Sequence, residues 1–480
     1  MLQGTGSDVG KSLLVAGLCR IARQRGIAVA PFKPQNMSNN AAACPGGGEI
    51  GRAQALQARA AGLDPVTDMN PVLLKPEGDR RAQVVVNGKA LRSDEAATYM
   101  AKRGSLLPTV LEAFERLKSA HELVIVEGAG SPAEVNLRRG DIANMGFSRA
   151  ADVPVILVGD IDRGGVIASL VGTKQVISSD DAEMIAGFAI NRFRGDPSLF
   201  DDGIRFVEDR TDWPCLGIVP WLDCAARLPA EDAVVLDKAR PEGTGILIAV
   251  PMLSRISNFD DLDPLRAEPG VEVRFIPPGQ PIPLDADAIV LAGTKSTITD
   301  LGMVRDQGWD HDILAAYRKG ISVVGICGGF QMLGHSIEDS KAVDGAAGSA
   351  QGLGLFDMMT VMTKDKLVRP VRGLTVTESD PVSGYEIHTG RSQGPAFDQP
   401  FCRLEDGTAE GALAAGGRLM GTYIHGLFAS DPFRSRWLGN LRSGFSSTTD
   451  YEQGVERALD ELAKGLEAAL DIDALFGLAR

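Results

Sequence analysis

Residues 4–12 read Gly4-Thr5-Gly6-Ser7-Asp8-Val9-Gly10-Lys11-Ser12, and this stretch decides the fold of the first half of the chain. It follows a short start, Met1 to Gln3, and precedes a helical pattern from Leu13 to Arg25. The backbone N–H groups of such a loop, with the positive end of the helix dipole, bind polyphosphate. Lys11 is expected to neutralise the phosphates of ATP, and Ser12 to ligate Mg²⁺. The residues assigned to ATP are Gly4, Thr5, Gly6, Gly10, Lys11 and Ser12.

The loop departs from the usual G-x-x-x-x-G-K-[ST] spacing, because Thr5 stands at the first glycine position and the glycine comes one residue earlier, at Gly4. The alternative interpretation is a glycine-rich turn that only starts a helix. The Gly-Lys-Ser ending and the strand-loop-helix context together favour the phosphate loop.

Short, almost continuously apolar runs alternate with helical stretches through the rest of the first half. Such runs are typical of parallel strands covered by helices on both faces, so the fold class is α/β with a doubly wound parallel sheet. The expected strands are Ile27 to Phe32, Leu123 to Val126, Val153 to Val158, Ile185 to Ile190 and Cys215 to Val219.

A polar stretch without periodicity separates the two halves and is interpreted as a linker. The second half repeats the α/β pattern, with expected strands at Ile246 to Val250, Val271 to Ile276, Ala288 to Ala292 and Val323 to Ile326. Gln453 to Leu470 is expected to form an amphipathic helix that packs back on the body. The predicted domains are residues 1–228 for the ATP-dependent half, 229–245 for the linker, 246–440 for the second α/β domain and 441–480 for a helical tail.

Composition excludes several classes of function. The 480 residues carry a formal net charge of −14, which argues against general nucleic-acid binding. No apolar run is long enough to span a membrane, so a membrane role is not expected. The six cysteines are scattered, without a C-x-x-C pair, which predicts free thiols in a reducing cytoplasm.

Two carboxylates are candidates for the magnesium site. Glu127 ends a strand in Val124-Ile125-Val126-Glu127-Gly128-Ala129-Gly130, where the carboxyl ends of parallel strands face the ligand. Glu49, in a glycine-rich loop, is a weaker candidate. For each of them the alternative is an acidic residue that binds no metal.

These motifs, with Phe32-Lys33-Pro34, Asn191 after a strand and Val219-Pro220-Trp221-Leu222, resemble the dethiobiotin synthetase-like branch of P-loop ATPases. The resemblance implies activation of a carboxylate by ATP. It also implies that Asn191 contacts the adenine, while a turn-forming asparagine is the alternative.

The second half contains a cysteine on a sharp turn, in Val323-Val324-Gly325-Ile326-Cys327-Gly328-Gly329-Phe330-Gln331. A strand, a turn flanked by glycines and a following helix expose a thiol as a nucleophile, and the Gly328 N–H can serve as half of an oxyanion hole. His425 follows a short apolar strand and is the expected base. The alternative is an inert buried cysteine, which would not explain the glycine-flanked turn or the histidine.

The pair Cys327 and His425 resembles the class I, or triad, glutamine amidotransferases. This resemblance implies a glutamyl thioester and release of ammonia. Typical members have a glutamate two residues after the histidine, but Leu427 stands there, which leaves open what orients His425. Gly293, in Leu291-Ala292-Gly293-Thr294-Lys295, is expected to give the other oxyanion N–H, with Thr294 as the neighbouring choice and an ordinary turn as the alternative.

A carboxylate-activating ATPase joined to an ammonia source is an amidoligase by chemical logic. The whole chain to about residue 440 resembles the cobyrinate amidotransferases of cobalamin biosynthesis through several long motifs. They are Phe32-Lys33-Pro34-Gln35-Asn36-Met37-Ser38-Asn39-Asn40, Glu49-Ile50-Gly51-Arg52-Ala53-Gln54, Asn136-Leu137-Arg138-Arg139-Gly140-Asp141, Gly293-Thr294-Lys295-Ser296-Thr297 and Gly384-Tyr385-Glu386-Ile387-His388.

Within that family the resemblance implies glutamine and adenosylcobyrinic acid a,c-diamide as substrates, amidated at the b, d, e and g side chains. The amide-rich run beginning at Asn36 argues against the a,c-diamide synthases, whose corresponding stretch is acidic. Arg138 is a candidate for binding the corrin carboxylates, Asp141 for positioning the substrate, and Asn36 for contacting it. Arg138 and Asp141 can equally be solvated surface charges. The oligomeric state, the order of amidations and the ammonia path are left open.

Two other classes remain as alternatives. A partitioning-type switch ATPase shares the sheet, but it carries an extra lysine early in its loop and has no reason for Cys327. An ammonia-dependent synthetase whose second domain is only a scaffold would be indifferent to the loss of that thiol.

Overall fold

The computed structural model describes residues 1–78, 80–229, 245–345 and 347–480. The chain forms two compact units. Unit 1 comprises Met1–Ser38, Gly48–Pro229 and Val455–Arg480, and the described parts of unit 2 lie within Asn39–Gly47 and Ala230–Gly454. The predicted linker 229–245 falls almost entirely on residues 230–244, outside the described residues. Each unit is therefore built from more than one stretch of sequence.

Unit 1 contains the predicted doubly wound parallel sheet, so this part of the fold prediction is confirmed. Its strands are β1 (Leu2–Gly4), β2 (Val29–Phe32), β9 (Leu123–Val126), β10 (Val155–Asp160), β11 (Ile185–Phe193) and β12 (Cys215–Pro220). β2 pairs with β9, and β1, β10, β11 and β12 pair in that order, all in parallel. A parallel bridge between Leu2 and Glu127 joins the two groups at the edge where the phosphate loop begins.

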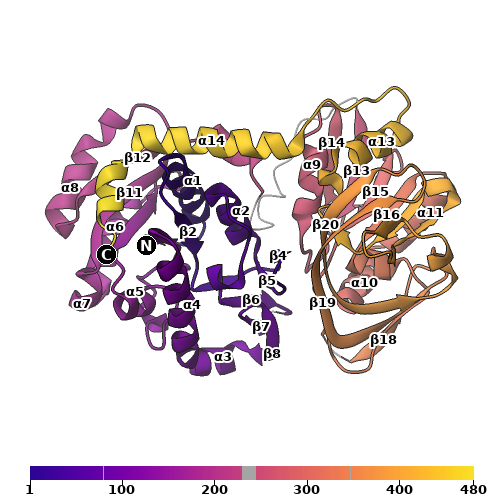
Figure 1. The fold of residues 1–480 in the computed structure, drawn as a ribbon, viewed down its shortest axis with the longest axis horizontal. Helices are drawn as coiled ribbons and strands as arrows, with labels where there is room; N and C mark the ends of the chain where they lie inside the picture. Colours follow the sequence, from indigo (N-terminus) through magenta and orange to yellow (C-terminus); the bar gives the residue numbers. More distant parts are fainter. Residues whose placement is uncertain (79, 230–244, 346) are drawn as a thin grey trace. The chain divides into compact units, whose positions relative to one another are not determined.

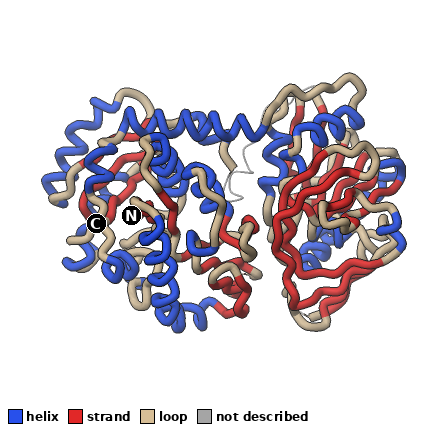
Figure 2. The backbone as a smooth tube through the Cα atoms, in the orientation of Figure 1, coloured by secondary structure: helices blue, strands red, loops and turns tan. Residues whose placement is uncertain are grey.

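Helices cover this sheet, as Figures 1 and 2 show for unit 1. They are α1 (Lys11–Gln24), α2 (Arg52–Ala61), α4 (Leu107–Ala120), α5 (Met145–Ala151), α6 (Val166–Val176), α7 (Ser179–Ala182), α8 (Asp201–Thr211), α14 (Tyr451–Ala469) and α15 (Ile472–Gly477). The apolar runs seen in the sequence are buried on both faces of the sheet because these helices lie on each side.

A smaller mixed sheet, which the sequence reading did not identify, completes unit 1. It consists of β3 (Gln35–Met37), β6 (Val72–Pro76), β7 (Arg81–Val86) and β8 (Lys89–Glu95), followed by α3 (Ala96–Lys102). The short β5 (Glu49–Gly51) leads into α2.

The C-terminal helix α14 lies along α1 (Figure 1). A Cβ on Gly17 would clash with Leu466, so the glycine allows the two helices to approach closely. Arg20 forms ion pairs with Glu456, at 2.8 Å, and Asp460, at 2.7 Å, along the same contact. Residues Val455–Arg480 are thus part of unit 1.

Unit 2 is also α/β, as predicted. Its six-stranded sheet has the order β14 (Val271–Ile276), β13 (Ile246–Pro251), β15 (Ala288–Leu291), β16 (Ser322–Ile326), β24 (Leu419–Thr422) and β23 (Ala412–Ala414), parallel except for β23. The helices are α9 (Asp263–Arg266), α10 (Thr297–Asp306), α11 (Trp309–Arg318), α12 (Gly328–Met332) and α13 (Asp431–Leu441).

A second, largely antiparallel sheet in unit 2 was not foreseen (red in Figure 2). It contains β17 (Ser336–Asp339), β18 (Gly348–Gln351), the long hairpin β19 (Met359–Thr375) and β20 (Pro381–Gln393), β21 (Cys402–Leu404), β22 (Ala409–Glu410) and β25 (Ile424–His425). The hairpin strands are half exposed and rich in charge, so they lack the continuous apolar run that marked the other strands. β4 (Ala41–Ala43) also belongs to unit 2.

Candidate functional site

The phosphate loop joins β1 to α1 in unit 1. Gly10 adopts φ 92°, a left-handed conformation, directly before the helix begins. Lys11 Nζ donates to the Gly6 carbonyl at 3.1 Å and to the Gly130 carbonyl at 3.3 Å, so its ammonium lies over the loop. The side chain of Asn191 donates to the Val9 carbonyl at 2.8 Å and fixes the loop from β11. The residues predicted to bind ATP are therefore close together.

Glu127 lies at the centre of a buried polar cluster beside this loop. Its carboxylate, 1% exposed, accepts hydrogen bonds from Ser12 Oγ at 2.7 Å, Lys33 Nζ at 2.8 Å and Gln57 Nε2 at 2.6 Å. A hydroxyl and a carboxylate in contact are oxygen donors of the kind Mg²⁺ takes together with phosphate oxygens and water. Ser12 and Glu127 therefore fit a magnesium ion.

The other metal candidate, Glu49, has a different partner. It is fully buried and forms an ion pair with Lys75 at 3.0 Å. Among the residues that the structure describes, no three His, Cys, Asp or Glu side chains gather closely enough to hold a metal ion. Any magnesium site here consequently depends on the nucleotide for further ligands.

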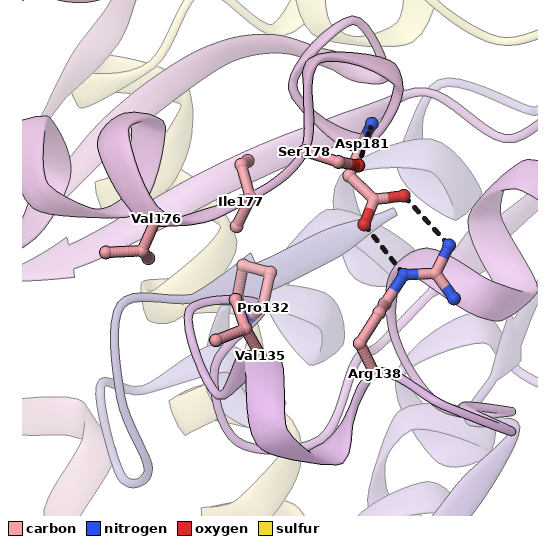
Figure 3. A pocket seen from close by; sticks show the side chains of 7 residues that line it. All are labelled: Pro132, Val135, Arg138, Val176, Ile177, Ser178 and Asp181. Carbon is pink, nitrogen blue, oxygen red and sulfur yellow. Dashed lines mark hydrogen bonds and ion pairs between the residues drawn. The ribbon is translucent and has the colours of Figure 1, made fainter.

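Each predicted substrate residue already has a partner in unit 1. Arg138 makes a two-point ion pair with Asp181, at 2.7 and 2.9 Å, beside a pocket lined by Pro132, Val135, Val176, Ile177 and Ser178 (Figure 3).

Asp141 and Asn36 are likewise engaged. The Asp141 carboxylate accepts backbone N–H bonds from Ala143 and Gly146, both at 2.8 Å, at the start of α5. Asn36 donates to Gln54 at 2.9 Å. Asp141 thereby stabilises the turn before α5.

Two arginines that the sequence analysis did not single out also converge on the phosphate loop. Arg163 Nη2 lies 2.6 Å from Asp8 Oδ2. Arg192 lies 3.5 Å from Asp8 Oδ1 through Nη2 and 2.9 Å from Asp160 Oδ2 through Nη1. Asp8 and Arg192 both have positive φ, 58° and 62°, which is costly for residues with a side chain. In the sequence, the one indication of a role for Arg192 was that it directly follows the predicted ATP-binding residue Asn191.

The cysteine turn has the predicted geometry. Cys327 lies between β16 and α12 with φ 51° and ψ −110°, and its N–H donates to the Thr422 carbonyl at 2.8 Å. A Cβ on Gly329 would clash with the Leu291 carbonyl, so only glycine fits there. The thiol, in a side chain 8% exposed, is presented at the end of the sheet.

His425 is held by an acid from a distant part of the sequence. Its Nδ1 lies 2.7 Å from Asp261 Oδ2, and both side chains are 2% exposed. The other carboxylate oxygen accepts the Gly426 N–H at 2.6 Å. Asp261 lies on the short 3₁₀ helix η7 (Phe259–Leu262) and was not predicted. The adjacent buried acids Asp260 and Asp261 between Phe259 and Leu262 were the only signal.

The electrostatics of this group favour a charged histidine. Burial lowers the pKa of His425, but the Asp261 carboxylate and a hydrogen bond with Cys327 outweigh it, so the pKa lies above its ordinary value. His388, by contrast, has its pKa lowered to about 4 by burial and stays neutral.

The predicted oxyanion residues lie beside these side chains. A Cβ on Gly293 would be 3.1 Å from His425 Cε1, and one on Gly328 would be 3.2 Å from Thr294 N. The backbone N–H groups of this strand end and of the cysteine turn are therefore near each other, as an oxyanion hole requires.

A polar network lies next to the cysteine turn. Tyr423 contacts Ser392 at 2.5 Å and Gln331 at 3.3 Å through its hydroxyl, and its ring stacks on His388 at 3.9 Å. Glu386 instead pairs with Arg369 at 2.6 Å.

Comparison with known families matches both halves. Residues 1–235 match the CobQ/CobB/MinD/ParA nucleotide binding domain, and residues 247–433 match the CobB/CobQ-like glutamine amidotransferase domain. A nucleotide-binding domain and a glutamine amidotransferase domain on one chain define a glutamine-dependent amidoligase, and this class of enzyme agrees with both sites.

Full-length relatives narrow the assignment. Proteins named cobyric acid synthase from Hyphomonas neptunium and Paracoccus denitrificans are 63% and 62% identical over 480 residues, covering all of this chain and 97% and 99% of theirs. One from Brucella anthropi is 57% identical over 479 residues, covering all of this chain and 99% of its own. The chain belongs to the cobyric acid synthase family.

Solved structures are more distant. One described as "Structure of PurLQS from Thermotoga maritima" has a TM-score of 0.31 at 14% identity and covers 45% of this chain and 98% of its own. Another, a glutamine amidotransferase, has a TM-score of 0.30 at 15% identity and covers 40% and 97%. These values add nothing to the assignment. Among the described residues no helix is long and apolar enough to cross a membrane.

Proposed function

We propose that this enzyme amidates the b, d, e and g side-chain carboxylates of adenosylcobyrinic acid a,c-diamide with ATP and glutamine, giving adenosylcobyric acid. Membership of the cobyric acid synthase family supports the substrate. The scattered cysteines and the need for ATP and glutamine favour the cytoplasm as the place of action.

In unit 1, a substrate carboxylate oxygen attacks the γ-phosphorus of ATP, the bond to the β,γ-bridging oxygen breaks, and ADP leaves. Lys11 balances the phosphate charge. Ser12 and Glu127 would hold the Mg²⁺, which would neutralise charge on the phosphates when bound. Ammonia then attacks the acyl carbon and inorganic phosphate leaves. The contact of Ser12 with Glu127 at 2.7 Å supports this assignment.

In unit 2, the Cys327 thiolate attacks the side-chain amide carbon of glutamine. The oxyanion is stabilised by N–H groups near Gly293 and Gly328. His425 gives its proton to the departing nitrogen, so ammonia leaves and a glutamyl thioester remains. Water, with His425 as base, then releases glutamate. The observation that carries this proposal is the buried contact between His425 and Asp261 at 2.7 Å.

The test is a mass spectrum of adenosylcobyrinic acid a,c-diamide after incubation with Mg-ATP and either glutamine or ammonia. The wild-type protein should amidate it stepwise with both nitrogen sources, and Cys327→Ala with ammonia only. Cys402→Ala, another buried cysteine in unit 2, is the matched control and should behave as wild type.

Three outcomes would change the proposal. If the diamide is unchanged but cobyrinic acid, supplied in a parallel incubation, is amidated at the a and c positions, the enzyme is an a,c-diamide synthase. Glutamine-driven activity that survives in Cys327→Ala would remove the glutaminase assignment. No mass change with either nitrogen source would remove the corrinoid.

A further inference from the structure

A short piece of the ATP half of the sequence belongs to the glutaminase unit. Residues Asn39–Gly47 lie between two stretches of unit 1 but are part of unit 2. Their strand β4 is buried throughout. The preceding residues, from Asn36, form the amide-rich run. This segment, Asn39–Gly47, is therefore covalently continuous with the ATP-binding unit and built into the other one.

The segment is held by a reciprocal pair of asparagines. The Asn258 N–H donates to Asn40 Oδ1 at 2.6 Å, and the Ala41 N–H donates to Asn258 Oδ1 at 3.0 Å. The two asparagine side chains are 4% and 3% exposed. Asn258 itself is left-handed, with φ 51° and ψ 39°, a conformation that asparagine tolerates better than most residues. Buried hydrogen bonds of this kind fix the backbone on both sides.

Asn258 lies between the two halves of the glutaminase machinery. On one side the Asp261 N–H donates to the Asn258 carbonyl at 3.1 Å, and Asp261 holds His425. On the other side the Ser257 N–H donates to the Gly293 carbonyl at 2.8 Å, next to the candidate oxyanion N–H groups. A shift at Asn258 consequently moves both the acid behind the base and the oxyanion strand end.

The other end of the same run contacts the nucleotide cluster of unit 1. Asn36 donates to Gln54 at 2.9 Å, and Gln54 donates to Glu127 at 3.4 Å. Asn36 and Asn40 are separated only by Met37, Ser38 and Asn39. Hydrogen bonds thus link Glu127 to Asn36 and Asn40 to Asn258, and a stretch of five residues joins Asn36 to Asn40.

We propose that Asn40 and Asn258 are positioning residues through which the ATP-binding unit controls the glutaminase site. The segment Asn39–Gly47 holds Asp261 and the Gly293 strand end in register, and its position reports on the cluster around Glu127. This inference rests on the proposed function in one respect: it takes the Cys327 site to be the glutaminase.

The test compares Asn40→Leu, which removes the acceptor for the Asn258 N–H, with Asn40→Asp, which keeps it. Glutamate formation is measured for each variant with no addition, with Mg-ATP, and with Mg-ATP and adenosylcobyrinic acid a,c-diamide. The exposed Asn440→Leu in α13 is the control for an Asn-to-Leu change in unit 2.

We expect Asn40→Leu to lower kcat for glutamine hydrolysis about 10- to 100-fold, with KM for glutamine nearly unchanged, because a misplaced base slows the reaction without altering binding. Any stimulation by the added ligands seen in wild type should disappear. Amidation driven by ammonia should persist. Asn40→Asp should recover most of the glutaminase rate, and Asn440→Leu should match wild type.

Unchanged glutaminase kinetics in Asn40→Leu would overturn the proposal. So would an equal loss of the glutamine- and ammonia-driven reactions, which would indicate general damage, and so would failure of Asn40→Asp to recover activity. The two proposals can fail separately. If the wild-type protein hydrolyses glutamine but never amidates the corrinoid, the substrate proposal fails. The rates of glutamine hydrolysis measured without the corrinoid still test the proposal about Asn40 and Asn258.

Discussion

Replacing Asp261 by asparagine tests the arrangement that holds His425. The amide is nearly isosteric, and its oxygen can still accept the Gly426 N–H, which lies 2.6 Å from Asp261 Oδ1. Its NH₂ group then faces His425 Nδ1, which must act as the acceptor. The imidazole proton is thereby placed on Nε2, so that the ring can no longer take a proton from Cys327.

The size of the effect follows from the lost charge. Asp261 and His425 are 2.7 Å apart, N to O, and both are 2% exposed. With charge centres about 4 Å apart and an effective dielectric constant of about 20, the attraction is about 4 kcal/mol. Loss of this amount in the transition state corresponds to a decrease of about 10³-fold in kcat for glutamine hydrolysis.

The assay is glutamate formation at saturating glutamine, together with ammonia-driven amidation by the same protein. Asp261→Asn should lose the first and keep the second. Asp263→Asn, in the next turn of the chain, where the carboxylate faces Arg266 at 3.4 Å, is the matched control and should keep both. A glutaminase rate in Asp261→Asn within about threefold of wild type would refute the reasoning. It would mean that the Coulomb attraction between Asp261 and His425 contributes almost nothing to stabilising the transition state.

Three further predictions concern other parts of the molecule. Glu127→Gln should lower ATP-dependent amidation with either nitrogen source by about 10²-fold or more while glutamine hydrolysis without ATP continues, and both are measurable by product formation. Burial raises the pKa of Glu410 from 4.5 to about 7. Because the folded state then keeps a proton that the unfolded state loses, the free energy of unfolding should fall by about 3 kcal/mol as pH rises through this window. Urea titrations should find this slope in wild type and not in Glu410→Gln, and equal slopes would contradict the assignment. Gly329→Ala should destabilise the protein by about 1–3 kcal/mol and abolish glutamine-driven activity, because the new methyl group meets the Leu291 carbonyl. Gly302→Ala in α10, where a Cβ would meet nothing within 4 Å, should do neither, as thermal unfolding would reveal.

Local features were predictable from the sequence. The phosphate loop and the cysteine turn each consist of neighbouring residues whose φ angles, small side chains and flanking elements follow from a few letters. Most strands of the two parallel sheets were also identified, since burial on two faces demands continuous apolar runs, but β1, β23 and β24 were not among the expected strands.

Features that depend on distant contacts were not predictable. Asp261 and His425 are far apart in the sequence and meet only because η7 lies beside β25 in the folded unit. No periodicity marks such a pair, and the short element that carries the acid has no signature of its own. The position two residues after the histidine, where the class I glutamine amidotransferases carry the triad acid, is occupied by the buried Leu427.

Charged residues illustrate the same limit. Arg138 and Asp141 were interpreted as candidate substrate residues, with a solvated surface charge as the alternative, but a sequence does not indicate which charges pair with each other. In the structure Arg138 faces Asp181 at 2.7 Å, and Asp141 accepts the N–H groups at the start of α5. If Arg138 or Asp141 binds substrate, it must share or break these contacts.

The packing of α14 on α1 has a consequence for biosynthesis. The ribosome makes Gly17 early and its partner Leu466 near the end, and at about 5–20 residues per second the interval is roughly 20–90 s. During that time the exposed face of α1 has no cover from α14. Unit 2 ends at Gly454, so all of its residues emerge before the last part of unit 1, Val455–Arg480. The nascent chain is therefore able to finish unit 2 before unit 1, whose last stretch, Val455–Arg480, is made after all of unit 2.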